Sequence, residues 1–131
     1  MSYILFLDDI REIDKDVKLP VCDFLERKTA INYEKFVEII NTFGLPDVIS
    51  FDFDLCPDHY QIGARNHFMS LVGYEKCNIP TGLDCAKFLI NHCQKNKLQL
   101  PICYSHSQNL AGQRAIVELI KKYKEKYAPQ D

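Results

Sequence analysis

The sequence predicts an α/β fold: a single domain that forms a three-layer sandwich, with a mainly parallel sheet of about four strands and helices on its faces. Short apolar runs alternate with segments of helical periodicity, which is the pattern of βαβ units. The first of these runs is apolar throughout, as strands covered on both faces are. A chain of 131 residues with 47% hydrophobic and 26% charged residues is long and apolar enough for one globular core.

The first strand is predicted over residues 3–7. We expect it at the centre of the sheet, because it is the most apolar run in the chain. Residues 10–22 are mostly polar and indicate a loop or a short helical turn. A second and weaker strand is predicted within residues 23–30, where apolar and polar residues alternate loosely.

The first helix is predicted over residues 33–43, where apolar residues follow helical spacing. Asn32 is a suitable N-cap for this helix, and Gly44 is a suitable stop at its other end. The next strand is predicted directly afterwards, over residues 47–53.

Residues 55–80 form a long segment with several prolines and glycines and no sustained period. A connection of this length inside a compact domain is usually functional or contains a short element of its own. We therefore expect a functional loop or insertion here. Thr81 then caps a further helix, and Asp84 stands three residues later, where a capping box carries an acidic or amide side chain.

The last strand is predicted over residues 102–105, and the final helix begins near Leu110. The polar face of this helix carries lysines interrupted by glutamates, namely Lys121, Lys122, Lys124, Lys126, Glu118 and Glu125. Such a face is typical of a solvated helix surface, and an RNA-binding stripe is the alternative. Right-handed crossovers leave few topologies for this order of strands and helices.

Charge and composition exclude several classes of protein. The net charge of −2 provides no overall attraction to nucleic acid or anionic lipid, so we expect neither a double-stranded DNA partner nor a membrane. No apolar stretch is long enough to cross a bilayer, and acids cut the first apolar run too short for a signal peptide. The six cysteines are scattered, as free thiols in a reducing compartment are. We therefore expect a cytoplasmic protein, in the host cytoplasm if its source is viral.

Three of the apolar runs, at residues 3–7, 48–51 and 102–104, end in polar residues suited to catalysis or metal binding. These polar residues are Asp8, Asp9, Asp52, Asp54 and His106, with Ser105 and Ser107 beside the histidine. The carboxyl ends of parallel strands share one edge of a sheet, and open α/β sheets bind ligands at that edge. We therefore expect four carboxylates and one imidazole in a single crevice.

Each acidic pair has a functional and a structural interpretation. Adjacent carboxylates such as Asp8 and Asp9 repel one another unless a cation neutralises them, and Mg²⁺ accepts such ligands while keeping waters for a phosphate. One of the two could instead cap the following turn. Asp52 and Asp54 would share one face of a strand. One of them could be a metal ligand, a base or a nucleophile, and the alternative is that this polar face is simply exposed to water. Arg11 could pair with a carboxylate or hold a phosphate.

His106 stands at the same expected edge, and histidine is a residue type suited to acid–base chemistry. The alternative is a structural role, which is the commoner one for a lone histidine. Ser107, Asn109 and the free N–H groups at the start of the following helix could bind an anion such as phosphate.

The long segment also carries four side chains of the kinds that zinc accepts. They are Cys56, His59, His67 and Cys77. Their spacing, C-x2-H-x7-H-x9-C, matches no familiar zinc motif, so the sequence leaves a zinc site open.

At these residues the chain resembles a known family, the cyclic-phosphate-processing receiver domains of bacteria and phages, which are highly derived response-regulator receivers. The matching stretches are residues 6–11 (FLDDIR), 49–55 (ISFDFDL), 58–60 (DHY), 81–89 (TGLDCAKFL) and 104–109 (YSHSQN), with Gly112. They cover most of the chain in the right order. The resemblance implies a receiver-like, flavodoxin-like sheet with an acidic pocket. It also implies that the active site includes Asp8, Asp9, Asp52, Asp54, His59 and His106.

One residue departs from the family pattern. The family often carries a histidine between the two acids of the third-strand motif, where this chain has Phe53. In a strand, position 53 points away from Asp52 and Asp54. We therefore expect Phe53 to face the core, as a conservative packing substitution.

These observations lead to one expected function and two alternatives. We expect a metal-assisted phosphoesterase that acts on a cyclic phosphate of a nucleotide or RNA end. Its expected residues are Asp8, Asp9 and Asp52 for a divalent metal such as magnesium, His106, His59, Asp52 and Asp54 for catalysis, and Arg11, Ser107 and Asn109 for the substrate. The first alternative is a non-enzymatic receiver-like signalling module. The chain lacks an evident fifth strand ending in lysine, and this absence argues against that alternative. The second is a protein that binds and sequesters a cyclic nucleotide.

Overall fold

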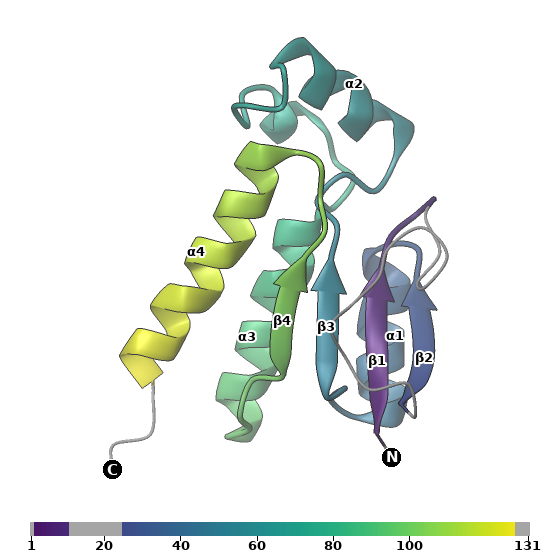
Figure 1. Ribbon diagram of the computed structural model, residues 1–131, viewed down its shortest axis with the longest axis vertical. Coiled ribbons are helices and arrows are strands. Elements are labelled where there is room, and N and C mark those ends of the chain that lie inside the picture. Colours follow the sequence, from purple (N-terminus) through teal and green to yellow (C-terminus); the bar gives the residue numbers. More distant parts are fainter. Residues whose placement is uncertain (1, 11–24, 128–131) are drawn as a thin grey trace.

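The computed structural model describes residues 2–10 and 25–127, and it shows a four-stranded parallel sheet (Figure 1). The strands are β1 (Tyr3–Leu7), β2 (Glu26–Ala30), β3 (Val48–Phe51) and β4 (Ile102–Ser105), in the spatial order β2-β1-β3-β4. Every neighbouring pair is parallel. The predicted receiver-like α/β fold is therefore confirmed, and β1 lies inside the sheet, as its apolar sequence predicts.

The helices are α1 (Tyr33–Phe43), α2 (Pro57–Arg65), the short 3-10 helix η1 (Tyr74–Lys76), α3 (Gly82–Asn96) and α4 (Leu110–Tyr127). Two of the helices, α1 and α3, begin directly after the predicted caps Asn32 and Thr81. The side chain of Asn32 accepts a hydrogen bond from the N–H of Lys35 at the start of α1. Thr81 and Asp84 form a reciprocal capping box at the start of α3. These local hydrogen bonds satisfy N–H groups that have no partner inside the helix.

The strand predicted over residues 47–53 is shorter in the structure, because β3 ends at Phe51. Asp52 and Asp54 therefore lie on the turning segment after the strand. The segment 55–80, expected as a functional loop or insertion, contains α2 and η1. It stands above the carboxyl edge of the sheet (Figure 1), and we call residues 56–80 the upper lobe.

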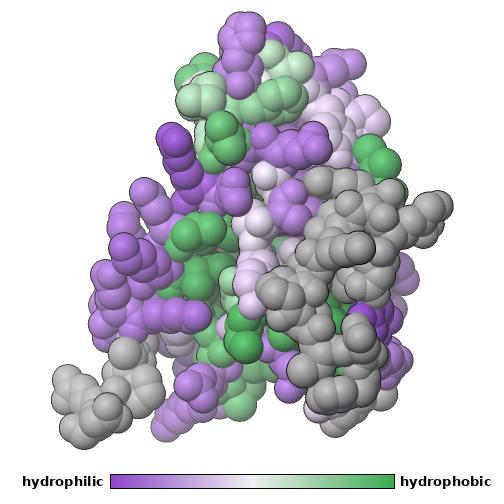
Figure 2. All heavy atoms as spheres, in the orientation of Figure 1, coloured by the Kyte–Doolittle hydropathy of each residue, from purple (hydrophilic) through white to green (hydrophobic). Residues whose placement is uncertain are grey.

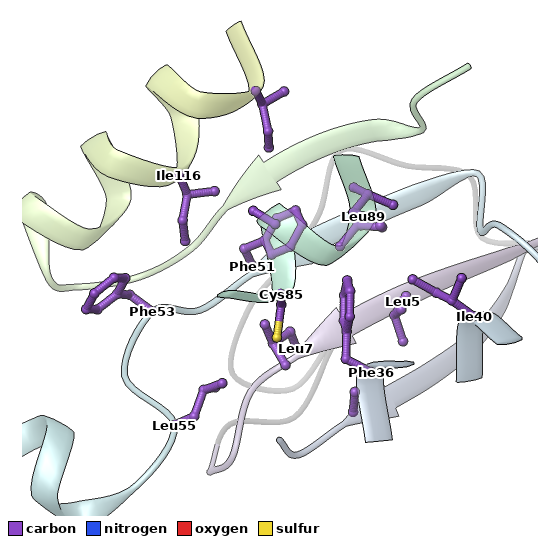
Figure 3. Packing of buried hydrophobic residues seen from close by; sticks show 14 of the residues in the cluster. Leu5, Leu7, Phe36, Ile40, Phe51, Phe53, Leu55, Cys85, Leu89 and Ile116 are labelled. Carbon is purple, nitrogen blue, oxygen red and sulfur yellow. The ribbon is translucent and has the colours of Figure 1, made fainter. Parts of the chain in front are cut away.

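The core lies between one face of the sheet and the helices α1, α3 and α4. Leu5, Leu7, Phe51, Phe36, Leu89 and Ile116 belong to it (Figure 3). Phe53 is buried in the same cluster, so it faces the core as predicted. Within the described residues, no helix packs on the opposite face, so the second helical layer of the expected sandwich is not observed in this part of the chain. By strand alternation, Phe6 and Ser50 point to that opposite face.

The polar face of α4 is exposed to water. Its lysines at positions 121, 122, 124 and 126 are exposed, and Figure 2 shows hydrophilic residues along this helix. No helix in the described part of the chain is long and apolar enough to cross a membrane. The cysteines of the described residues are free thiols, namely Cys56, Cys77, Cys85, Cys93 and Cys103.

Candidate active site

Three strand ends meet at the carboxyl edge of the sheet. Asp8 follows β1, Asp52 follows β3 and His106 follows β4. Each of these residues offers one possible ligand atom, and the three atoms lie within 4.8 Å of one another. The two carboxylates are almost fully buried, with 1% and 2% of Asp8 and Asp52 exposed. The parallel order β1-β3-β4 explains why residues far apart in the sequence come together here.

Asp8, Ser50 and Phe6 hold the ring of His106. Its Nε2 lies 2.9 Å from Oδ2 of Asp8, and its Nδ1 lies 2.6 Å from Oγ of Ser50. The ring also stacks on Phe6, with centroids 4.4 Å apart and planes inclined by 6°. An ionised carboxylate can only accept, so Nε2 donates to Asp8. Ser50 can either donate to Nδ1 of the neutral ring or accept from the imidazolium, so the chain Ser50–His106–Asp8 can hold one extra proton.

Ser50 is one of the site residues that the sequence analysis missed, together with Tyr74, which bonds to Asp54, and Phe68, which lines the pocket beside the strand ends. The Ser50 side chain is fully buried in the middle of β3. It lies in register with Phe6 on one neighbouring strand and with Tyr104 on the other. A buried hydroxyl needs a hydrogen-bond partner. A lone serine in the apolar run VISF was the signal that could have identified it.

Asp8 and Asp9 point to different partners although they are adjacent. Oδ1 of Asp8 accepts from the N–H of Ile10 at 2.9 Å, so Asp8 also caps the turn after β1. Oδ1 of Asp9 accepts from the hydroxyl of Tyr60 in α2 at 2.8 Å. Burial raises the pKa of the Asp9 carboxyl above its usual value, and the hydrogen bond from Tyr60 opposes this shift. Asp9 is therefore tied to the upper lobe and lies outside the group of three ligand atoms.

The first turn of α3 fixes the backbone around Asp52. The N–H of Gly82 donates to the carbonyl of Phe53 at 2.9 Å. A Cβ atom at position 82 would lie only 1.7 Å from the carbonyl oxygen of Asp52. Only glycine therefore allows α3 to begin so close to the end of β3, and this close approach sets where the Asp52 side chain starts.

Asp54 belongs to a second buried network. Its Oδ1 accepts from the hydroxyl of Tyr74 at 2.5 Å, and its Oδ2 accepts from Nδ2 of Asn109 at 3.3 Å. Burial raises the pKa of Asp54, while these two hydrogen bonds act in the opposite direction. Oδ1 of Asn109 accepts from the N–H of Gly112 and so caps α4. The Asn109 side chain, expected to bind phosphate, thus joins the segment after β3 to Tyr74 of the upper lobe and to α4.

His59 differs from its expected acid–base role. It is fully buried, its Nδ1 accepts from the N–H of Leu55 at 2.9 Å, and its Nε2 lies 2.9 Å from the carbonyl oxygen of Ile79. A backbone N–H only donates and a carbonyl only accepts, so the ring is neutral with its hydrogen on Nε2. Both nitrogens are occupied, and in this structure His59 joins the two ends of the upper lobe.

Three of the four possible zinc ligands lie together. Ligand atoms of Cys56, His59 and Cys77 are within 4.8 Å of one another. His67 is not part of this group and is exposed. The imidazole of His59 would have to give up a backbone hydrogen bond to bind a metal. The geometry therefore favours the hydrogen-bonded arrangement over a zinc site.

An open pocket of about 210 Å³ adjoins the strand ends. Asp52, Asp54 and Ser107 are among the residues that line it. Oγ of Ser107 accepts from the N–H of Asn109, which leaves its hydroxyl proton to be donated to a ligand. Of the described residues that line the pocket, two are carboxylates and none is lysine or arginine, so a bound phosphate would need a cation. Arg11, expected to hold phosphate, lies outside the described residues.

A larger cavity of about 640 Å³ lies in the upper lobe, between α2 and η1. Gln61, Arg65 and Lys76 are among its lining residues, and none of the carboxylates at the strand ends reaches it. The smaller pocket is therefore the one that adjoins the candidate chemistry.

A comparison with known families identifies the family of the chain. The family model of the cyclic-phosphate processing receiver domain matches residues 3–122, which include all three strand ends and the upper lobe. No curated protein and no solved structure matches the chain. The resemblance inferred from the sequence motifs is confirmed: the chain belongs to the family of cyclic-phosphate processing receiver domains.

Proposed function

We propose that this protein is a metal-assisted phosphoesterase that opens a cyclic phosphate of a nucleotide or RNA end. One observation carries the proposal: the chain Ser50–His106–Asp8 ends beside Asp52, and Asp52 also lines the open pocket. The Asp52 carboxylate therefore lies both beside the proton-accepting chain and in the wall of the open pocket. Membership of a family named for cyclic-phosphate processing supports the substrate class.

Asp8 and Asp52 are the residues that would hold a divalent cation. Their carboxylates are buried close together, and a cation would offset the repulsion between them. Two carboxylates suit magnesium, and manganese accepts the same oxygen ligands. When bound, such an ion supplies charge stabilisation of the phosphoryl oxygens and a more acidic water.

The Asp8 carboxylate is proposed to receive the proton that an attacking water loses, because Nδ1 of His106 faces the buried Ser50 and Nε2 faces Asp8. His106 is held between Ser50 and Asp8, and its donation from Nε2 positions that carboxylate. Asp54, whose pKa is raised by burial, lines the same pocket and is the proposed proton donor to the leaving sugar oxygen. The P–O bond to that oxygen breaks, and a phosphomonoester results.

The test is hydrolysis of nucleoside 2′,3′-cyclic phosphates with magnesium, manganese or zinc, by the wild type and by His106→Ala. Loss of acid–base catalysis should lower kcat by at least about 100-fold. His92→Ala, a histidine on α3 away from the strand ends, is the matched control. Circular dichroism and Tm verify that both variants fold. Unchanged turnover in His106→Ala removes the role given to this residue.

Two other outcomes would point to the alternative functions. Tight binding of a cyclic nucleotide without product after prolonged incubation would indicate a sequestering protein. A stable aspartyl phosphate, detected by intact mass after incubation with a small phosphodonor, would indicate a signalling receiver.

A further inference from the structure

The pocket beside Asp52 is lined by two chemically different kinds of side chain. Asp52, Asp54 and Ser107 are polar, and Ile10, Tyr60 and Phe68 supply apolar surface. The hydroxyl of Tyr60 is already bonded to Asp9, so the part of Tyr60 left to meet a ligand is its ring. A ligand that fills this pocket should therefore carry both a charged group and a flat apolar group.

Phe68 reaches the pocket through an unusual stretch of backbone. His67 and Phe68 are consecutive, and their φ angles are 52° and 58°. This left-handed region is one that residues other than glycine rarely adopt. The N–H of Phe68 donates to the carbonyl of Gly63 at 2.8 Å, and the carbonyl of Phe68 accepts from Ala111 at the start of α4 at 3.1 Å. Backbone held in such a conformation by its surroundings is common at ligand-binding positions.

The ring of Phe68 is held on one side by α2. A Cβ atom at Gly63 would lie 2.9 Å from Cε1 of Phe68, so the ring packs where only glycine leaves room. The side chain is half-buried, and its remaining surface lines the pocket. Phe68 is thus held by α2 through its ring and its N–H, and by α4 through its backbone carbonyl, before any ligand arrives. Such a preorganised surface binds at a lower entropic cost.

We infer that Phe68 recognises the organic part of the substrate by stacking against a nucleobase, which makes the substrate a nucleotide cyclic phosphate. This inference rests on the proposed function. The sugar phosphate would meet Asp52 and its cation, and the base would meet the ring of Phe68. Stacking on an aromatic side chain tolerates any base, because every base has a π-face. Phe68 should therefore favour substrates that carry a base, without discriminating between bases.

The test compares a cyclic phosphate that carries a base with one that does not, adenosine 2′,3′-cyclic phosphate and glycerol 1,2-cyclic phosphate. The measured quantity is kcat/KM for the nucleotide divided by kcat/KM for the glycerol compound. In Phe68→Ala this ratio should fall about 10-fold, mainly because KM for the nucleotide rises. Phe68→Tyr should restore the ratio. Met69→Ala is the matched control, because Met69 is 57% exposed and does not line the pocket. An unchanged ratio, or equal losses on both substrates, overturns the inference.

Calorimetric binding separates this inference from the proposed hydrolysis. The ligands are adenosine 2′-phosphate and glycerol phosphate, titrated into the wild type and Phe68→Ala. If the wild type hydrolyses neither substrate but binds the nucleotide more tightly, and Phe68→Ala loses this preference, the proposed hydrolysis fails and the stacking role stands. If the wild type hydrolyses both substrates equally well, the stacking role fails and the hydrolysis stands.

Discussion

Nε2 of His106 lies 2.9 Å from Oδ2 of Asp8, although the two residues are 98 positions apart in the chain. Their strands are not neighbours, because β3 lies between β1 and β4. The imidazole spans this middle strand, and Ser50 of β3 holds its other ring nitrogen. The position of His106 therefore depends on three strands at once.

Removal of the Ser50 hydroxyl should impair catalysis more than folding. In Ser50→Ala the ring of His106 loses one of its two hydrogen bonds, whose net value is about 1 kcal/mol. We expect kcat to fall about 5- to 10-fold with KM little changed, because Ser50 positions His106 and does not line the pocket. Steady-state kinetics measure this split. Ser105→Ala is the control, since its hydroxyl bonds to a backbone carbonyl and not to His106, and equal behaviour of both variants would contradict the positioning role.

Metal binding should distinguish Asp8 and Asp52 from Asp9. The sequence suggested all three as ligands, but in the structure Asp9 accepts from Tyr60 and lies outside the group of ligand atoms. Titration calorimetry with Mg²⁺ and Mn²⁺ should show affinity reduced at least about 10-fold in Asp8→Asn and Asp52→Asn, and by much less in Asp9→Asn. Asp58→Asn, an exposed acid on α2, is the control. If Asp9→Asn weakens binding as much as the other two, Asp9 is a ligand after all.

Much of the fold could be predicted because its signals are local. The apolar run of β1, the N-cap Asn32 and the pair Thr81 and Asp84 each depend on neighbours within a few residues. The helix α2 was not placed, because it is short and its segment lacks a sustained apolar period. The early end of β3 at Phe51 could not be foreseen either, because the close approach of Gly82 from α3 accompanies it.

The site also has features that the sequence predicts and features that depend on distant contacts. The meeting of Asp8, Asp52 and His106 follows from parallel strands alone, since their ends share one edge. The roles of His59 and Asn109 do not follow, because each depends on a partner distant in the chain, such as Ile79 or Asp54. The sequence alone does not show whether the ring nitrogens of a histidine bond to backbone groups or to a substrate.

The raised pKa of Asp54 predicts a pH-dependent stability. Burial is the main cause, and hydrogen bonds from Tyr74 and Asn109 only partly oppose it. The folded state therefore binds this proton more tightly than the unfolded state. Its contribution to stability is complete below the unfolded pKa of about 3.9 and is lost as the pH rises through the higher folded value. Asp54→Asn has no such titration, so its free energy of unfolding should rise relative to the wild type across this window.

Urea unfolding from about pH 4 to about pH 7, with a chelator present to exclude metal binding, measures this difference. Tyr74→Phe should be destabilised at every pH, because Asp54 and Asn109 lose a shared partner while the ring remains. A constant difference between Asp54→Asn and the wild type across the range would show that the Asp54 carboxyl is not perturbed.

Gly82→Ala should damage both the fold and the site. The added Cβ would overlap the backbone oxygen of Asp52, which cannot rotate away as a side chain can. Either α3 or the end of β3 must shift, at a cost of about 1–3 kcal/mol in the free energy of unfolding. Since Asp52 is a proposed metal ligand, metal affinity should fall in the same variant. Urea unfolding and calorimetry measure the two effects, with Lys87→Ala on the exposed face of α3 as the control. Stability within about 0.5 kcal/mol of the wild type would mean that the two backbones can separate without cost.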